Sequence, residues 1–296
     1  MRVLFESKNL IGDALYIGPA LRAWIKSRKS SIVQDEIYLS TLNDHITSLY
    51  QGMVRDMVRL NIVFERPAGH FDFEHVFNVN KAFALSDKRK QHIAQSYADL
   101  LGVGIGAGPD GDGYASYKPI YIPVMDSITG AALDELRGCI LVSMFSASCA
   151  SRGNPPQPAN KMLPFPKWKP MLKLLQDTYP RAPIRFLGAP TDRIPDELKD
   201  YVYSEAMFGI PLNRLALIMR EAKLLVTIDN GMGHLAATQD TPTFLMYPRC
   251  LGAHYILPIG NKNLLTWVHM DPMSVSPTQL RHGLQYAIQK LEALKK

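Results

Sequence analysis

The stretch "LLVTIDNGMGHLAAT", residues 224–238, passes from a run of apolar and β-branched residues into a run of small ones. The first five residues predict a buried strand, and the small-residue pattern at the end predicts a helix. Asp229, Gly231 and His234 fall in or just after the turn between the two. Open α/β sheets bind ligands beyond the carboxyl ends of their strands, so this turn is a candidate binding site.

The residues of this turn suit an anionic ligand. The backbone N–H groups of Asn230, Gly231 and Met232 would begin the helix, where orphan donors and the helix dipole attract anions. Glycine lets a phosphate approach the backbone closely, and His234 can donate to a phosphate oxygen or a sugar hydroxyl. A purely structural interpretation is equally compatible with the residue types: Asp229 would cap the helix and His234 would face solvent.

The same strand–helix rhythm runs along the chain and predicts an α/β protein with parallel sheets built from βαβ units. We expect two Rossmann-like domains, residues 1–130 and 131–296, without a visible sequence repeat. Strands are predicted at residues 2–6, 36–40, 139–145, 184–188, 224–228 and 243–247, and helices at 12–29, 44–51, 86–102, 165–179, 211–222, from Met232 onward, and 277–294. In the helix at 211–222, helical spacing predicts four apolar residues that face inward: Leu212, Leu215, Ile218 and Met219.

Three local signals refine this organisation. Pro19, inside a helical pattern, predicts a kink or a late helix start. Ser86 is predicted as the N-cap of a helix that closes at Gly102. The glycine-rich residues 102–119 follow a helix and run into Pro109, whereas a dinucleotide fingerprint lies between a strand and a helix. This stretch is therefore interpreted as a connecting loop.

Composition limits the classes of protein and partner. Of the 296 residues, 47% are hydrophobic and 20% charged, which is typical of a globular chain and excludes compositional disorder. The net charge of +6 favours anionic partners: phosphorylated small molecules, an anionic membrane surface or nucleic acid. Three scattered cysteines and the lack of a signal peptide or long apolar run indicate a cytoplasmic protein, with peripheral contact to the inner membrane as one option.

The opening stretch also carries a family resemblance. "DNGMGHLAAT…TPTFLMY" resembles the motif of glycosyltransferase family nine, which includes the lipopolysaccharide heptosyltransferases. Asp229, Gly231, His234 and Pro242 match that motif, whereas Asn230 replaces the usual serine or threonine. A backbone contact would survive this replacement, but a contact through the side-chain hydroxyl would change.

Two further motifs follow in the family's order. "NLIGDALYIGPALRAW" resembles the amino-terminal motif, with its Gly-Asp pair at Gly12 and Asp13. "NKMLPFPKW" is similar to the segment that carries the family's loop lysine; Lys161 and Pro164 match, and Leu163 stands where the family has an aromatic residue. The resemblance thus spans most of the chain.

The resemblance implies a GT-B architecture, two Rossmann-like domains facing across a cleft, with the final helix as an element that can pack back on the first domain. The carboxyl-terminal domain would bind a nucleotide-diphospho-sugar such as ADP-heptose. The amino-terminal domain would bind a glycan acceptor such as lipopolysaccharide core. Inverting transfer needs a general base, and Asp13, on a loop after the first strand, fits that role. The alternative for Asp13 is a helix N-cap.

The other site assignments also follow from the resemblance. Lys161 and the amides at residues 230–232 would stabilise the leaving diphosphate. No cofactor besides the donor is expected, and the transfer is predicted to be independent of metal ions. Two alternatives stay open: transfer to another acceptor, for example a hydroxylated base in DNA, and a nucleotide-binding module without turnover. The remaining assignments are Ser146 and Ser148 near the phosphates, Asp229 holding sugar hydroxyls or bracing the loop, Ile210 as nucleobase wall or core residue, and Asn9 with Gly12 in the acceptor loop.

Overall fold

The chain forms two compact units in a computed structural model. Unit 1 comprises Met1–Val124 and His254–Gly260, and unit 2 comprises Met125–Ala253 and Asn261–Lys296. The division falls six positions before the boundary expected at residue 130, and a short late segment is assigned to unit 1. The structure describes residues 2–7, 10–27, 36–41, 44–55, 61–63, 75–78, 81–103, 121, 123, 136–146, 162–201, 207–248, 257–269 and 272–294.

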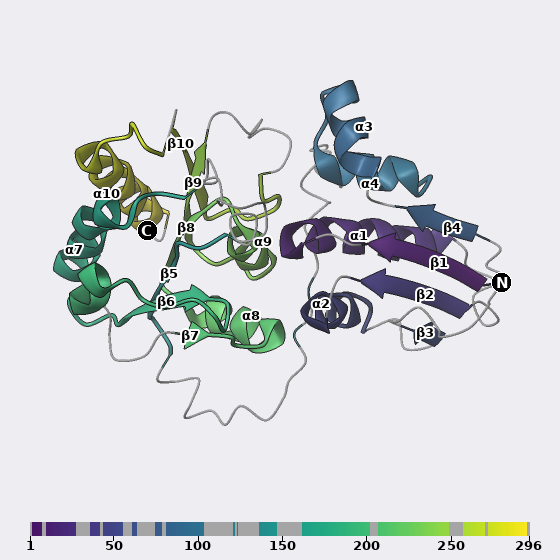
Figure 1. The fold of residues 1–296 in the computed structure, drawn as a ribbon, viewed down its shortest axis with the longest axis horizontal. Helices are drawn as coiled ribbons and strands as arrows, with labels where there is room; N and C mark the ends of the chain where they lie inside the picture. Colours follow the sequence, from purple (N-terminus) through teal and green to yellow (C-terminus); the bar gives the residue numbers. More distant parts are fainter. Residues whose placement is uncertain are drawn as a thin grey trace. The chain divides into compact units, whose positions relative to one another are not determined.

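Unit 1 contains a parallel sheet in the order β3-β2-β1-β4 (Figure 1). The side chains of Val3, Leu4 and Phe5 in the central strand β1 are all buried, as expected for a parallel strand covered on both faces. The strands are β1 (Arg2–Ser7), β2 (Glu36–Thr41), β3 (Asn61–Val63) and β4 (His75–Asn78). Chain order runs from β1 to β3 on one side and returns to β4 on the other, so the order reverses between β1 and β4.

The helices of unit 1 are α1 (Ile11–Ser27), α2 (Asp44–Val54), α3 (Ala82–Arg89) and α4 (Ile93–Leu100). Helix α1 begins at Ile11 and continues through Pro19, so a late start after the proline is wrong. Helix α1 packs closely on α2: a Cβ atom added at Gly18 would lie only 2.0 Å from Met53 Sδ.

The helix predicted to begin at Ser86 is instead two helices. Ser86 lies inside α3, and its hydroxyl donates to the carbonyl of Gln91 at 2.5 Å. Lys90 has a φ of +53°, which ends the helical conformation between α3 and α4. His92 is the N-cap of α4, because its side chain accepts from the N–H of Ala94. The predicted end is confirmed, since α4 stops at Leu100 and Gly102 adopts φ +66°.

Unit 2 contains a six-stranded parallel sheet in the order β10-β9-β8-β5-β6-β7 (Figure 1). The chain runs from β5 outward to β7, then returns to pair β8 with the other side of β5. Both units therefore show the same reversal of strand order, and the predicted α/β class with parallel sheets is confirmed. The strands are β5 (Ile140–Ser143), β6 (Ile184–Gly188), β7 (Met207–Phe208), β8 (Leu224–Ile228), β9 (Thr243–Pro248) and β10 (Leu264–His269).

Helices cover both faces of this second sheet. Figure 1 shows α7 and α10 on one face and α8 and α9 on the other, and α10 packs against α7 within unit 2. The predicted inward positions of α8, Leu212, Leu215, Ile218 and Met219, are all buried. The helical elements are η3 (Phe165–Trp168), α7 (Lys169–Thr178), η4 (Asp196–Tyr201), α8 (Leu212–Glu221), α9 (Gly231–Thr238) and α10 (Pro277–Ala293).

A lysine fixes the turn that leads into α10. The ammonium group of Lys167 donates to the backbone carbonyls of Pro272 at 3.1 Å, Met273 at 2.5 Å and Val275 at 2.7 Å. The helix then begins with a capping box formed by Ser276. Among the described residues, no helix is long and apolar enough to cross a membrane.

Candidate functional site

The candidate site of unit 2 lies at the carboxyl edge of its sheet, between β5 and β8. These strands are neighbours, with Ser143 opposite Thr227, and the strand order reverses between them. At such a reversal the connections that follow the two strands turn to opposite faces of the sheet, and open α/β sheets bind ligands in the crevice at that point. The turn at residues 229–231 and the segment 144–146 after β5 therefore line the position where α/β sheets bind ligands.

Asn230 joins the two sides of this crevice. Its Nδ2 donates to Ser143 Oγ at 2.9 Å and to the carbonyl of Phe145 at 2.8 Å. Its Oδ1 accepts from the N–H of Met232 at 2.9 Å and lies 3.1 Å from the hydroxyl of Thr227. Two of these partners determine the orientation of the amide, because the carbonyl of Phe145 can only accept a hydrogen bond and the N–H of Met232 can only donate one. Asn230 therefore caps α9 and ties the end of β8 to the end of β5.

This geometry corrects two sequence interpretations. The cap of α9 is Asn230, not Asp229, and His234 does not face solvent: Asp229 is 4% and His234 7% exposed. Met232 gives its N–H to the Asn230 side chain, so it is not one of the amides available to an anion. The first N–H groups of a helix lack intrahelical acceptors, so Gly231 and Gly233 carry the amides of this turn that can bind an anion.

Aromatic side chains border the crevice on the β6–β7 side. Phe145, directly after Met144 at the end of β5, makes edge-to-face contacts with Phe165 and Phe208, with ring centroids 6.3 Å and 6.0 Å apart. Ile210 follows β7 and is half-buried. Because neighbouring strands are about 4.8 Å apart, the end of β7 lies about 10 Å from the end of β5. Ser146 is also half-buried and lies beside Phe145 in the chain.

Glycine is required where the loops after β6 and β7 meet. A Cβ atom on Gly188 would lie 2.6 Å from Asp192 Oδ2 and 2.9 Å from the Phe208 ring. The same Asp192 oxygen accepts from the N–H of Ala189 at 2.6 Å, and the N–H of Gly209 donates to the carbonyl of Gly188. These contacts hold Phe208 and the loops in a single packed arrangement next to Phe145.

The proposed base lies in unit 1. Asp13 is half-buried and stands in the first turn of α1, three residues after the helix-capping position Leu10. The expectations of a loop residue or an N-cap are therefore both wrong, because α1 starts earlier than the proline pattern indicated. Its Oδ1 accepts from the hydroxyl of Tyr97 on α4 at 3.1 Å. Gly12 precedes it in the same turn.

Three of the predicted site residues, Asn9, Ser148 and Lys161, lie outside the described residues, so their predicted roles stay predictions.

The sequence analysis missed three residues that shape these sites: Ser143, Thr227 and Tyr97. Ser143 and Thr227, polar residues at the carboxyl ends of apolar strands, carried a readable signal. Tyr97 carried none, because its relation to Asp13 depends on how two helices pack.

Among the residues that the structure describes, no group of three histidine, cysteine, aspartate or glutamate side chains could hold a metal ion. Cys139 is a free thiol; burial raises its pKa to about 11, although the charge of Arg185 acts in the opposite direction. A thiol with so high a pKa is unreactive near neutral pH.

Comparison of the whole structure with solved structures gives an extensive match. Heptosyltransferase II of Escherichia coli, an ADP-heptose LPS heptosyltransferase, matches with a TM-score of 0.63 over 99% of this chain and 100% of its own, at 12% identity. A family 9 glycosyl transferase from Veillonella parvula matches with 0.60 over 98% and 97%, also at 12%. The chain has the fold of the family-nine glycosyltransferases.

A third structure with the family-nine fold is TibC, a dodecameric iron-containing heptosyltransferase solved with ADP-D-β-D-heptose. It matches with a TM-score of 0.65 at 11% identity, over 98% of this chain and 77% of its own. The sequence matches no protein-family model, and no curated protein resembles it significantly in sequence. At identities of 11–12% the likeness establishes the fold of this chain and not its activity.

Proposed function

We propose that the protein is an inverting glycosyltransferase that moves a sugar from a nucleotide-diphospho-sugar to a hydroxyl of a bacterial glycan. The observation that carries the proposal is the reversal of strand order between β5 and β8, at whose carboxyl edge α9 is capped by Asn230 and begins with Gly231. A diphosphate needs closely approachable amides at the positive end of a helix dipole, and this turn supplies them. Two of the structures with the same fold are named for ADP-heptose.

The proposal assigns the donor to unit 2 and the acceptor to unit 1. An ADP-heptose-like donor would place its diphosphate at Gly231 and Gly233, with Lys161 and His234 as further phosphate or sugar contacts. Ser146, Ser148 and Ile210 remain proposed donor contacts, and Asn9 and Gly12 proposed acceptor contacts. Lipopolysaccharide core is the proposed acceptor, and the net charge of +6 supports working beside an anionic membrane surface.

The reaction follows from these roles. Asp13 accepts the proton of the attacking acceptor hydroxyl while the new bond forms at the anomeric carbon. The bond from that carbon to the phosphate oxygen breaks on the opposite face, and its electron pair leaves with the nucleoside diphosphate. The amides of α9 and the ammonium of Lys161 stabilise the charge that develops there. We propose that this transfer is independent of metal ions and of any cofactor besides the donor.

A nucleotide panel tests the donor site. ADP, UDP, GDP and CMP are each added to the full chain, and the melting temperature is followed. A ligand at 100 times its dissociation constant adds about 2.7 kcal/mol of apparent stability, which corresponds to roughly 5–10 °C for a domain of this size. ADP should give the largest shift. Lack of a shift with all four nucleotides would overturn the donor-site assignment.

Turnover tests the base. Release of ADP from ADP-heptose is measured with heptose-free lipopolysaccharide as acceptor. Asp13→Asn should lower kcat by about 100-fold or more while leaving the ADP-induced thermal shift unchanged. Asp44→Asn is the matched control, because Asp44 is an exposed aspartate in the first turn of another helix of unit 1. Equal rates for Asp13→Asn and Asp44→Asn would remove Asp13 from the mechanism.

A further inference from the structure

A buried tyrosine contacts the proposed base. The ring of Tyr97 is fully buried on α4, which packs against α1, and its hydroxyl donates to Asp13 Oδ1 at 3.1 Å. The two residues are 84 positions apart in the chain. A phenylalanine would fill the same space between the helices, so the hydroxyl is the part of Tyr97 that acts on the carboxylate.

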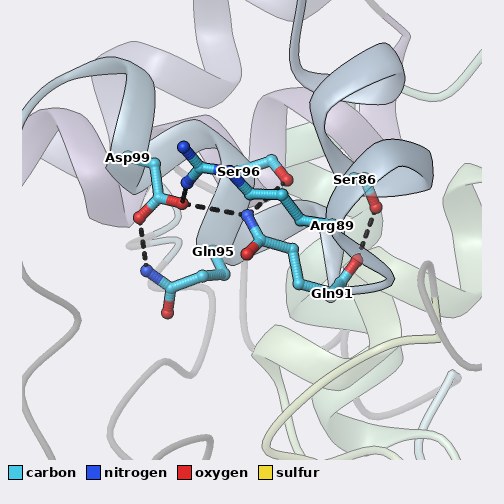
Figure 2. Close-up of polar contacts among 6 residues, drawn as sticks. All are labelled: Ser86, Arg89, Gln91, Gln95, Ser96 and Asp99. Carbon is cyan, nitrogen blue, oxygen red and sulfur yellow. Dashed lines mark hydrogen bonds and ion pairs between the residues drawn. The ribbon is translucent and has the colours of Figure 1, made fainter.

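A polar network holds the helix that carries Tyr97. Figure 2 shows Asp99 of α4 accepting from Arg89 at 2.6 Å, Gln91 at 3.0 Å and Gln95 at 2.7 Å. The hydroxyl of Ser86 in α3 donates to the Gln91 carbonyl (Figure 2). These bonds join α3, the Lys90 break and the outer face of α4, so that α4 is fixed relative to α3.

The first residue of α4 is fixed as well. Because His92 Nδ1 accepts from the N–H of Ala94 at 3.1 Å, the ring proton lies on Nε2, which donates to the carbonyl of Leu257 at 3.0 Å. The hydroxyl of Tyr16, one turn beyond Asp13 on α1, donates to the same carbonyl. The rings of Tyr16 and His92 meet edge to face with centroids 5.1 Å apart. Helices α1 and α4 are thus also held together through Tyr16, His92 and the Leu257 carbonyl, next to the Tyr97–Asp13 bond.

We propose that Tyr97 is a positioning residue for Asp13, an inference that rests on the proposed glycosyl transfer. By holding Oδ1, the hydroxyl restrains the rotamer of the carboxylate and therefore the direction of Oδ2, to which we assign proton abstraction. A hydrogen bond donated to a carboxylate also favours its ionised form. Tyr97 thereby keeps the base both oriented and deprotonated at lower pH.

The length of the bond sets the size of the effect. At 3.1 Å it is longer than the 2.5–2.7 Å typical of a strong hydroxyl–carboxylate bond. Its loss in Tyr97→Phe should therefore move the acidic limb of the kcat profile upward by about 0.5–1 pH unit, a three- to ten-fold change in proton affinity. Misorientation of the carboxylate should lower kcat at its plateau by about ten-fold, with the KM for ADP-heptose changed less than about two-fold because the donor lies in unit 2.

The experiment compares Tyr97→Phe with Tyr16→Phe in the full chain. Tyr16→Phe also removes the hydroxyl of a buried tyrosine, this time on α1. The Tyr16 hydroxyl donates to a backbone carbonyl and not to Asp13. Release of ADP from ADP-heptose is followed from pH 4 to 9, with circular dichroism at each pH. Because the folded fraction can itself fall with pH, kcat at each pH is divided by the folded fraction that circular dichroism measures there, so that reduced stability does not imitate the expected shift.

The outcomes separate the two proposals. A shifted limb in Tyr97→Phe together with an unshifted limb in Tyr16→Phe supports the positioning role. Parental limbs in both variants, while Asp13→Asn remains inactive, would overturn the role of Tyr97 and leave the glycosyl-transfer proposal intact. Full activity of Asp13→Asn would instead refute the base assignment, and the role of Tyr97 with it.

Discussion

Replacement of Asn230 by alanine should unfold unit 2 at a clearly lower denaturant concentration. The side chain makes four polar contacts across the β5–β8 crevice: to Ser143, Phe145, Thr227 and Met232. Loss of an asparagine N-cap costs about 1 kcal/mol, and each of the other bonds contributes about 1 kcal/mol net. Because the site is half-buried, water replaces part of these bonds, and the expected total is about 2–4 kcal/mol.

Urea unfolding followed by tryptophan fluorescence measures this loss. Trp168 and Trp267 both lie in unit 2, so a Trp24→Phe background reports on that unit alone. With a denaturant slope of about 2–3 kcal/mol per molar, the midpoint should fall by about 1 M. Asn213→Ala, which removes an asparagine in the first turn of α8, should shift it by less than about 0.3 M.

Two more substitutions at the same position separate capping from strand tying. Asn230→Ser keeps a capping oxygen and should be about 1 kcal/mol more stable than Asn230→Ala. Asn230→Asp keeps the acceptor for Met232, but its second oxygen would face the Phe145 carbonyl and would also repel a bound diphosphate. A midpoint for Asn230→Ala within about 0.3 M of the parent would refute the tying role of this side chain.

Two further outcomes are expected in the same unfolding assay. Lys167→Met leaves the three carbonyls before α10 without their charged donor and should cost about 1–3 kcal/mol, whereas exposed Lys173→Met should cost less than about 0.5 kcal/mol; equal costs would contradict this. Partial burial raises the pKa of Asp99, but the hydrogen bonds from Gln91 and Gln95 and the charge of Arg89 lower it by more, so the net pKa is below 3.8. A carboxyl group whose pKa is lowered in the folded state stabilises the fold above its unfolded pKa, and this contribution is lost as the pH falls through the folded pKa. Asp99→Asn should therefore cost about 1 kcal/mol at pH 7 and progressively less as the pH falls below 3.8; a cost independent of pH would refute it.

Much of the fold was readable from local pattern. The strands predicted at residues 184–188 and 224–228 are confirmed to the residue, and the inward face of α8 is confirmed at all four positions. The periodicity of apolar residues reports which side chains face a core, and this depends on near neighbours in the chain. The break at Lys90 was missed because the residues around it suit a helix, and the tertiary contacts of Ser86 and His92 decide where the chain turns.

The sequence by itself determined the α/β class, most strand and helix positions, and the chemical types of the turn at residues 229–234. Tertiary structure alone decided the strand order. That order brings Ser143 beside Asn230 across 87 positions, and the packing of α1 on α4 brings Tyr97 beside Asp13 across 84. The physical reason is that the spacing of apolar residues reflects the conformation of their own segment. The partner of a residue across a sheet or a helix pair depends instead on which distant segments pack together.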